Sequence, residues 1–185
     1  MKLETERLLL REFAESDWPA VLAYQSDPRY LRYYPLSHRT PEEVRRFVQA
    51  FIDQQHARPR TKFQLALILK ADKRLIGNCG IRRAALDAWE ANIGYELDPR
   101  EWGHGYATEA ARAIVRFGFE ELKLHRISAQ CIAENTASVR VLERIGLQCE
   151  GRLRETEWMT GRWWDTLLYG ILEREWQAAQ GEVRA

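Results

Sequence analysis

The stretch REWGHGYAT, residues Arg100–Thr108, decides how the rest of the chain is interpreted. A β-rich run, Asn92–Leu97, lies before it, and the apolar residues after it recur at helical spacing as far as Leu124. The stretch is therefore predicted to be a glycine-rich turn between a strand and a helix. Glycine lets the backbone approach a ligand closely, and the first amides of a helix have no intrahelical partner. Such a turn can bind an anion, and a diphosphate suits it well.

The pattern R-x-x-G-x-G differs from the two commoner phosphate-binding loops. It lacks the third glycine of the dinucleotide fingerprint and the Lys-Ser/Thr pair of nucleotide triphosphatases. The loop alone is equally consistent with a tight turn that binds nothing. The residues that follow it therefore have to decide between the two interpretations.

A helix, a strand and a second helix are predicted after the loop. The first helix runs from Tyr106 to about Leu122, and Arg126–Ile132 alternates as a strand does. Asn135 is a good N-cap for a short helix that Gly146 would end. Ser138 lies on the apolar face of that helix, so we expect it to be buried or to touch a ligand.

Three ordered motifs carry a resemblance to a known family. They are IGYEL at residues 93–97, R-x-x-G-x-G-Y-A-T-E-A at residues 100–110, and N-x-x-S-x-x-V-L-E-R-I-G-L at residues 135–147. Together they resemble the GNAT N-acetyltransferase superfamily, and most closely its RimJ/RimL-like branch, which includes ribosomal-protein N-terminal acetyltransferases. The resemblance extends from Thr5 to Asp165, which is nearly the whole chain.

The resemblance implies that acetyl-CoA is the co-substrate and assigns residues to it. The loop and the amides after it would bind the pyrophosphate, and the Leu97 backbone would hold the pantetheine arm and the thioester carbonyl. Asn135 would contact the cofactor from the far side, and Ser138 would lie near the sulfur and protonate the departing thiolate. The residues expected to bind the cofactor are Leu97, Arg100, Gly103, His104, Gly105, Tyr106, Ala107, Thr108, Asn135 and Ser138.

Two positions depart from the pattern of the wider superfamily. Leu142 stands where many members have a tyrosine that acts as the general acid, so the acid would be Ser138, a water molecule or nothing. Asn92 stands where a glutamate often precedes the first motif. Because side chains alternate along a strand, Glu96 shares the face of Asn92 and is the nearest carboxylate. Glu96 and Ser138 are therefore the candidate catalytic residues.

The chemistry of amines favours one kind of acceptor. The attacking amine must be neutral, and at pH 7 about one α-amine in seven is unprotonated, against about one lysine side chain in 2,500. A site without a strong base therefore favours an N-terminal or other low-pKa amine. The acceptor itself is not encoded, since peptide N-termini, amino acids, polyamines and amine antibiotics all suit such an enzyme. Specificity is expected in the loop Tyr30–Tyr34 and in a tryptophan-rich hairpin near Trp158.

Two other functions are compatible with the same residues. A non-catalytic acyl-CoA-binding module would explain the missing tyrosine and the weak candidate base. A different enzyme could use the loop for a nucleotide phosphate, although the sequence lacks the Lys-Ser/Thr pair and acidic metal ligands of such enzymes.

Length and composition indicate a single-domain protein without a nucleic-acid partner. The 185 residues suit one domain, 1–185, in which about 91–147 would form the acetyl-CoA-binding core. Lys and Arg number 28 against 27 Asp and Glu, so we expect no nucleic-acid partner. Without an apolar run of membrane length or a signal-peptide pattern, the protein is expected in the cytoplasm. The cysteines and histidines show no metal-ligand spacing, and each of the three cysteines is expected to be buried.

The expected fold is a mixed α/β structure, with a mostly antiparallel sheet of about seven strands and helices on both faces. The strands on either side of the Tyr106 helix are predicted to be parallel neighbours that, by the resemblance, splay apart. A homodimer is a further implication of the family. The remaining expected elements are a strand at Thr5–Glu12, a helix ending near Tyr24, a helix from Thr40 to His56, a hairpin of Phe63–Leu69 and Leu75–Ile81, a C-terminal hairpin at about 147–172, and a frayed tail after Glu173.

Overall fold

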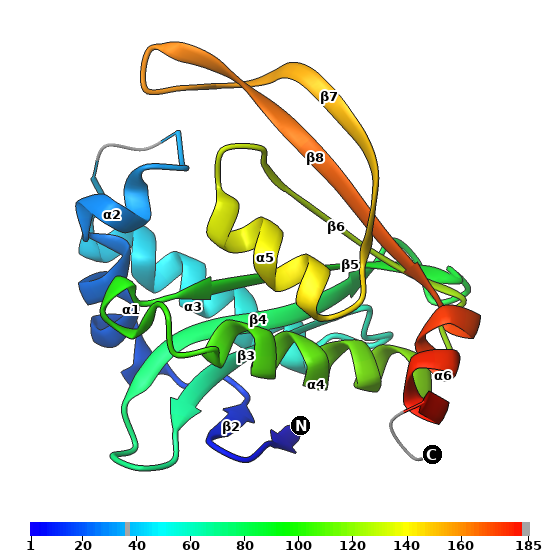
Figure 1. The fold of residues 1–185 in the computed structure, drawn as a ribbon. Coiled ribbons are helices and arrows are strands. Elements are labelled where there is room, and N and C mark those ends of the chain that lie inside the picture. Colours follow the sequence, from blue (N-terminus) through cyan, green and yellow to red (C-terminus); the bar gives the residue numbers. More distant parts are fainter. Residues whose placement is uncertain (36–37, 183–185) are drawn as a thin grey trace.

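The computed structural model describes residues 1–35 and 38–182, and one open sheet of eight strands runs through them. The strands lie in the order β1-β2-β3-β4-β5-β6-β8-β7 (Figure 1). All neighbours pair antiparallel except β5 and β6, which are parallel. The strands are β1 (Lys2–Glu4), β2 (Leu8–Arg11), β3 (Lys62–Leu69), β4 (Leu75–Arg83), β5 (Glu90–Leu97), β6 (Arg126–Ile132), β7 (Gln148–Met159) and β8 (Arg162–Leu172).

Helices cover both faces of this sheet, as predicted. α1 and α3 pack on one face, and α4 packs on the other. Side chains of β3 point alternately to the two faces of the sheet. Leu65 and Leu67 belong to the hydrophobic cluster under α4, whereas Ala66 and Ile68 belong to the cluster under α1 and α3. The helices are α1 (Trp18–Gln25), α2 (Pro28–Leu31), α3 (Pro41–His56), α4 (Tyr106–Glu120), α5 (Thr136–Arg144) and α6 (Glu173–Glu182).

The sheet is split between β5 and β6. Their parallel pairing covers three residue pairs, from Glu90 and Arg126 to Asn92 and Ser128. Beyond that point β5 continues beside β4 as far as Leu97, and β6 continues beside β8 as far as Ile132. The carboxyl-terminal halves of the two strands therefore separate. Helix α4 connects them, and α5 lies beyond the split (Figure 1).

Local signals place the helix ends where the sequence predicted them. Thr40 accepts a hydrogen bond from the Glu43 amide, and the Glu43 carboxylate accepts one from the Thr40 amide, which completes a capping box. The Asn135 side chain accepts from the Ser138 amide at 3.2 Å. Gly146 has a φ of 93°, which favours glycine after α5.

The first predicted strand is instead a short hairpin. The Thr5 amide donates to the carbonyl of Leu8 at 3.0 Å, which turns the chain between β1 and β2. The predicted strand Thr5–Glu12 was therefore wrong in its extent, and β1 is the edge strand that the sequence did not reveal.

The C-terminal tail is helical as far as Glu182, so the prediction that it frays after Glu173 was wrong for these residues, and residues 183–185 lie outside the described part of the chain. The Trp176 ring packs against Phe119 of α4, with ring centroids 5.2 Å apart. The Glu175 carboxylate accepts from the Leu172 amide at 2.9 Å and holds the start of α6. None of the helices in residues 1–35 and 38–182 is long and apolar enough to cross a membrane.

The tryptophans of the C-terminal hairpin and the three cysteines of the chain differ in how far they are buried. Trp164 is buried, while Trp158 and Trp163 pair across the two strands and are each about half exposed, at 56% and 53%. Cys149 is exposed because β7 is the outer edge of the sheet, which corrects the expectation that it is buried. Cys131 is half buried, and Cys79 is fully buried as expected.

Candidate active site

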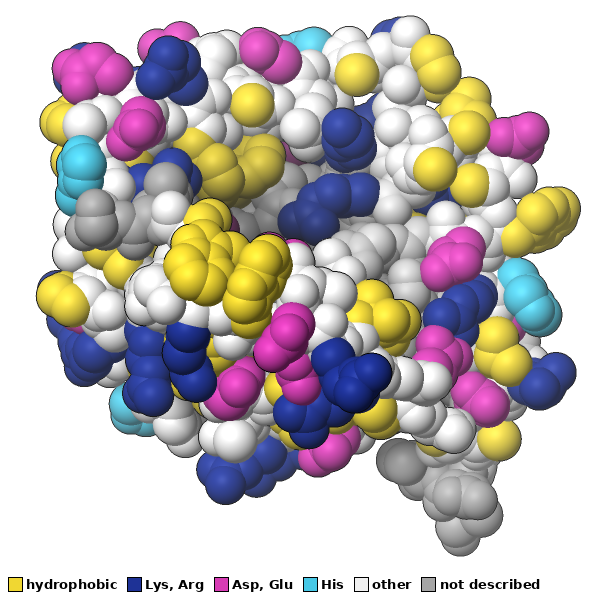
Figure 2. Space-filling model, turned by 90° about the horizontal axis from the view of Figure 1, so that it is seen from above, with side chains coloured by type: hydrophobic (Ala, Val, Ile, Leu, Met, Phe, Trp, Pro, Cys, Tyr) yellow, Lys and Arg dark blue, Asp and Glu magenta, His cyan; other side chains and the backbone are white. Residues whose placement is uncertain are grey.

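A cleft of about 700 Å³ lies at the carboxyl-terminal end of β5. Its walls come from that strand end, the loop before α4, the first turns of α4 and α5, and the segment from α2 to Tyr34. The space-filling view shows a hollow on this side of the molecule, with Lys or Arg side chains beside it (Figure 2). The cleft therefore joins segments that are far apart in the sequence.

Adjacent residues of β5 contribute to the cleft from opposite faces of the sheet. The Tyr95 hydroxyl contacts Ser138 of α5, which lies on the α4 side. Glu96 instead reaches Tyr24 and Gln25 of α1. Side chains alternate along a strand, so Tyr95 and Glu96 point to opposite faces of the sheet. Both reach the same cleft because the sheet is split at this point.

The glycine-rich loop has the geometry of an anion site. Gly103 and Gly105 have φ values of 84° and 81°, and a Cβ added at Gly103 would meet nothing within 4 Å. The first bond of α4 runs from the Glu109 amide to the Gly105 carbonyl at 3.0 Å. The amides of residues 106–108 precede that bond, and their residues line the cleft. The donor set and the open space at Gly103 fit a diphosphate.

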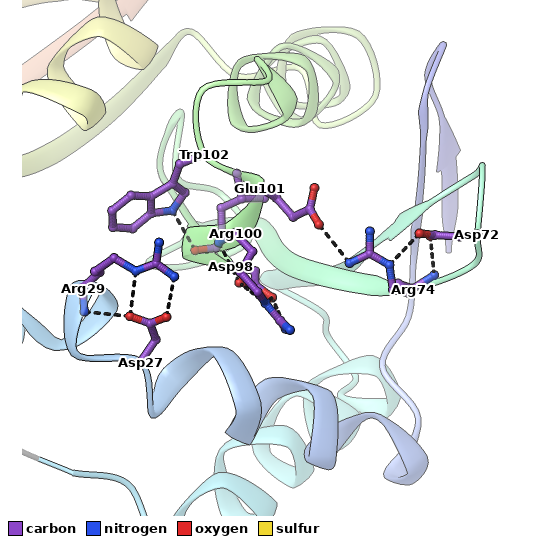
Figure 3. Close-up of polar contacts among 9 residues, drawn as sticks. Asp27, Arg29, Asp72, Arg74, Asp98, Arg100, Glu101 and Trp102 are labelled. Carbon is purple, nitrogen blue, oxygen red and sulfur yellow. Dashed lines mark hydrogen bonds and ion pairs between the residues drawn. The ribbon is translucent and has the colours of Figure 1, made fainter.

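Two ion pairs and a hydrogen bond from an indole hold the glycine-rich loop against the ends of β4 and β5 (Figure 3). The Trp102 indole donates to the Leu97 carbonyl at 3.0 Å, and Arg74 donates to the Glu101 carboxylate at 2.9 Å. Arg100 binds the buried Asp98 with its Nε and a terminal nitrogen, the latter at 2.6 Å. Burial opposes the charge of Asp98, but hydrogen bonds from Arg100 lower the pKa of that carboxyl overall.

Glu96 is held by three donors at a single oxygen. Its Oε2 accepts from the Tyr24 hydroxyl at 3.1 Å, from Gln25 Nε2 at 2.9 Å and from Asn78 Nδ2 at 2.9 Å. Tyr24, Gln25 and Asn78 are all at most 2% exposed, so these donors cannot move freely. Among residues 1–35 and 38–182, Oε1 has no such partner, and Glu96 lines the cleft. The carboxylate thus offers one oxygen to a ligand.

Ser138 forms a hydroxyl pair with Tyr95. The two hydroxyl oxygens are 2.8 Å apart, and the Tyr95 hydroxyl is also 3.1 Å from the Ser138 carbonyl oxygen. Burial raises the pKa of Tyr95, so the phenol stays protonated near neutral pH. The pair can therefore donate a proton toward the cleft or pass one between its members.

The structure brings most of the predicted site residues together. Arg100 and His104 are not among the cleft-lining residues: the Arg100 side chain pairs with Asp98, and the His104 carbonyl accepts from Arg7 at 2.9 Å. The predicted residues that line the cleft are Glu96, Leu97, Gly103, Gly105, Tyr106, Ala107, Thr108, Asn135 and Ser138.

Sequence reasoning did not assign several residues that the structure places at the site. Tyr95 stands inside the IGYEL motif, so the motif marked the position but not its role. Arg140 and Arg144 recur at the four-residue spacing of one helix face and could have been recognised on α5. Tyr24, Gln25 and Asn78 carry no sequence signal, because they come from α1 and β4. Residues 1–35 and 38–182 contain no group of His, Cys, Asp and Glu that could hold a metal.

Comparison with known proteins gives the family. Residues 7–148 match a family model described as an acetyltransferase (GNAT) domain. The chain belongs to the GNAT acetyltransferase family. It is 38% identical over 176 residues to the uncharacterized N-acetyltransferase YnaD of Bacillus subtilis (strain 168), and the match covers 95% of this chain and 99% of that protein. This GNAT protein is an acetyl-CoA-dependent N-acetyltransferase.

Two further relatives of this GNAT protein are informative. The crystal structure of a GNAT-family acetyltransferase from Bacillus anthracis superposes with a TM-score of 0.81 at 36% identity, covering 94% of this chain and 99% of that one. The [ribosomal protein uS5]-alanine N-acetyltransferase of Escherichia coli (strain K12) is 25% identical over 182 residues, which is 95% of this chain and 93% of that enzyme. The predicted GNAT fold is thereby confirmed, and the relatives include ribosomal-protein acetyltransferases.

Proposed function

We propose that this enzyme acetylates a primary amine by direct attack of the amine on acetyl-CoA inside the cleft. The observation that carries the proposal is that the Glu96 carboxylate and the Tyr95–Ser138 hydroxyl pair enter the same cleft from opposite faces of the sheet. One polar group can bind and deprotonate the amine, while the other can protonate the leaving group.

Acetyl-CoA supplies the activated acetyl group as a thioester. The loop amides at residues 103–108 would bind its diphosphate, with Arg140 and Arg144 beside them. Asn135 and the Leu97 backbone would contact the arm that follows. These residues orient the thioester, and orientation alone contributes several orders of magnitude to rate.

Glu96 Oε1 would receive the acceptor amine. Its partner oxygen is fixed by three donors, so the carboxylate keeps one orientation and presents Oε1, which accepts no hydrogen bond from the described part of the chain. The proposed step forms a C–N bond and breaks the C–S bond. The proton lost by the nitrogen passes to Glu96 or to solvent. The sulfur takes a proton from the Ser138 hydroxyl, which regains one from solvent, directly or through Tyr95.

A low-pKa amine suits this arrangement best. The uS5-alanine enzyme among the relatives acts on a protein N-terminal residue, as its name states. An α-amine needs little deprotonation at neutral pH, whereas a lysine side chain needs a strong base. We therefore propose an α-amine acceptor, and a lysine side chain acetylated faster than a matched peptide N-terminus at pH 7 would contradict that proposal.

The test measures thiol release from acetyl-CoA with a panel of N-terminal peptides, amino acids, polyamines and aminoglycosides. We expect one class of amine to stimulate release. Gly103→Glu should lower the affinity for acetyl-CoA at least about tenfold, because it places a carboxylate in the anion site. Gly161→Glu is the matched control, since Gly161 also has a positive φ and open space around its Cβ. Equal affinity in the two variants would contradict the assigned loop.

A further inference from the structure

We propose that the acceptor carries a carboxylate close to its amine, and that Arg32 recognises this carboxylate. The inference rests on the proposed acetyl transfer and deepens it, because it names the charge of the acceptor. It concerns the acceptor side of the cleft, defined by Glu96, Arg32 and the tyrosines at 30, 33 and 34.

The walls of the acceptor side are aromatic and fixed. The rings of Tyr30 and Tyr34 stack with centroids 4.5 Å apart, and Tyr30 is 6% exposed. The Tyr33 hydroxyl donates to the Glu134 carbonyl at 3.2 Å, and its ring packs edge-on against Trp164 at 5.9 Å. These contacts connect the segment after α2 to the turn between β6 and α5 and to β8. The shape of this side is therefore set, and its charge decides which amine it accepts.

The cleft lining carries more positive than negative charge. Its charged residues are Arg29, Arg32, Arg140, Arg144 and Glu96. Arg29 is paired with Asp27 and the α5 arginines lie on the cofactor side, so a cationic polyamine on the acceptor side would meet the Arg32 guanidinium as well as Glu96. An amine that also bears a carboxylate would instead match Glu96 with its nitrogen and a guanidinium with its acid group.

Among these arginines, Arg32 is the one best placed to bind the acceptor. Arg29 already binds the Asp27 carboxylate through Nε at 3.0 Å and a terminal nitrogen at 2.7 Å. Arg140 and Arg144 belong to α5, beside the loop amides that face the cofactor. The contact that the structure shows for the Arg32 guanidinium is with the Tyr33 ring, 5.3 Å from its centroid. The ion pairs within residues 1–35 and 38–182 do not include Arg32.

Two sources could supply the same chemistry. A free amino acid carries its carboxylate on the carbon that bears the amine, whereas a protein N-terminus can carry an acidic side chain at its second residue. Both place a negative charge near an α-amine, so they share the requirement for Arg32. They differ in length, and the acceptor pairs below separate them.

The test compares kcat/KM for acceptors that differ in charge. The pairs are Ala-Asp-Phe-amide against Ala-Asn-Phe-amide, and alanine against alaninamide, and spermidine is the cationic acceptor. Each kcat/KM is calculated from the concentration of the unprotonated amine. We expect an anionic acceptor to be favoured about tenfold within its pair, with spermidine the poorest substrate. The pair that shows the preference identifies the source.

Variants then assign the preference to a residue. Arg32→Ala should remove most of it and Arg32→Glu should reverse it, with the affinity for acetyl-CoA unchanged. Arg46→Glu makes the same change of charge at an exposed position of α3 and should leave the preference intact. Equal rates within both pairs, or a loss of acetyl-CoA affinity in Arg32→Ala with all acceptors slowed alike, would overturn the inference while leaving the acetyl transfer in place. Failure of every amine to be acetylated would overturn both.

Discussion

The Glu96 carboxylate is positioned by residues that no sequence motif marks. The Tyr24 hydroxyl that donates to it also accepts from Asn78 Nδ2 at 3.0 Å. Asn78 accepts in turn from Gln64 Nε2 at 2.6 Å, so the donors are themselves held. Buried polar groups of this kind are costly unless every member is paired. The network therefore fixes both the place of the carboxylate and the oxygen that it offers.

Replacing Glu96 by glutamine should separate its chemical role from its structural role. Glutamine keeps the shape but cannot take a proton, so we expect kcat/KM to fall about 100-fold. Acetyl-CoA affinity should stay within about twofold, because the loop amides and α5 arginines are untouched. The measurement is the rate with the best acceptor from pH 6 to pH 9, alongside the Kd of acetyl-CoA. An unchanged rate at pH 7 would show that solvent, and not Glu96, takes the proton.

The loop and helix α4 are held by a contact from the N-terminal hairpin. The Arg7 side chain binds Glu109 with Nε at 2.7 Å and also donates to the His104 carbonyl. Thr5 donates to the same Glu109 carboxylate at 2.5 Å, and the Arg7 amide donates at 2.8 Å. Glu109 lies in the first turn of α4, where a negative charge is favourable. Residues 5–7 thereby connect the glycine-rich loop to β2.

This contact makes part of the stability depend on pH. Burial alone would raise the pKa of Glu109, but hydrogen bonds from Thr5 and Arg7 hold it below its ordinary value of 4.5. A carboxyl with a lowered pKa stabilises the fold above its unfolded pKa, and that contribution is lost as the pH falls through the folded value.

Glu109→Gln should therefore lower the free energy of unfolding by about 1–2 kcal/mol at neutral pH, because glutamine cannot accept the charged hydrogen bonds as strongly. The deficit should shrink as the pH falls through the ordinary value of 4.5 and on through the lower folded pKa of Glu109, where the wild-type carboxylate becomes protonated. Urea unfolding of both proteins across that range measures it. A deficit that is constant with pH would mean that the charge of Glu109 contributes nothing.

Elements with local signals were predictable, and those that depend on distant contacts were not. Asn135, Gly146 and the capping box at Thr40 mark helix ends through their own chemistry, so the sequence located them. Helix α6 is polar apart from Trp176 and a few alanines, and what orders it is the contact with Phe119, more than fifty residues earlier. Arg100 was predicted to contact the cofactor, and its pairing with the buried carboxylate two residues before it could not be predicted, because the burial of Asp98 depends on the fold.

The whole molecule is organised around the split in its sheet. One hydrophobic cluster packs under α4, and a second packs under α1 and α3. The cleft opens at the end of β5, where the sheet no longer separates the two sides. The formal net charge of the chain is +1, so the positive lining of the cleft is a local feature and not a property of the whole surface. We propose that Arg32 within that lining selects the acceptor.

Direct transfer in one cleft requires both substrates to be bound together. Initial rates at crossed concentrations of acetyl-CoA and the best acceptor test this requirement most directly. Direct transfer predicts double-reciprocal lines that intersect, because the amine would attack the thioester while both substrates are bound in the cleft at the end of β5. Parallel lines, the mark of a covalent acetyl-enzyme and a ping-pong mechanism, would contradict it.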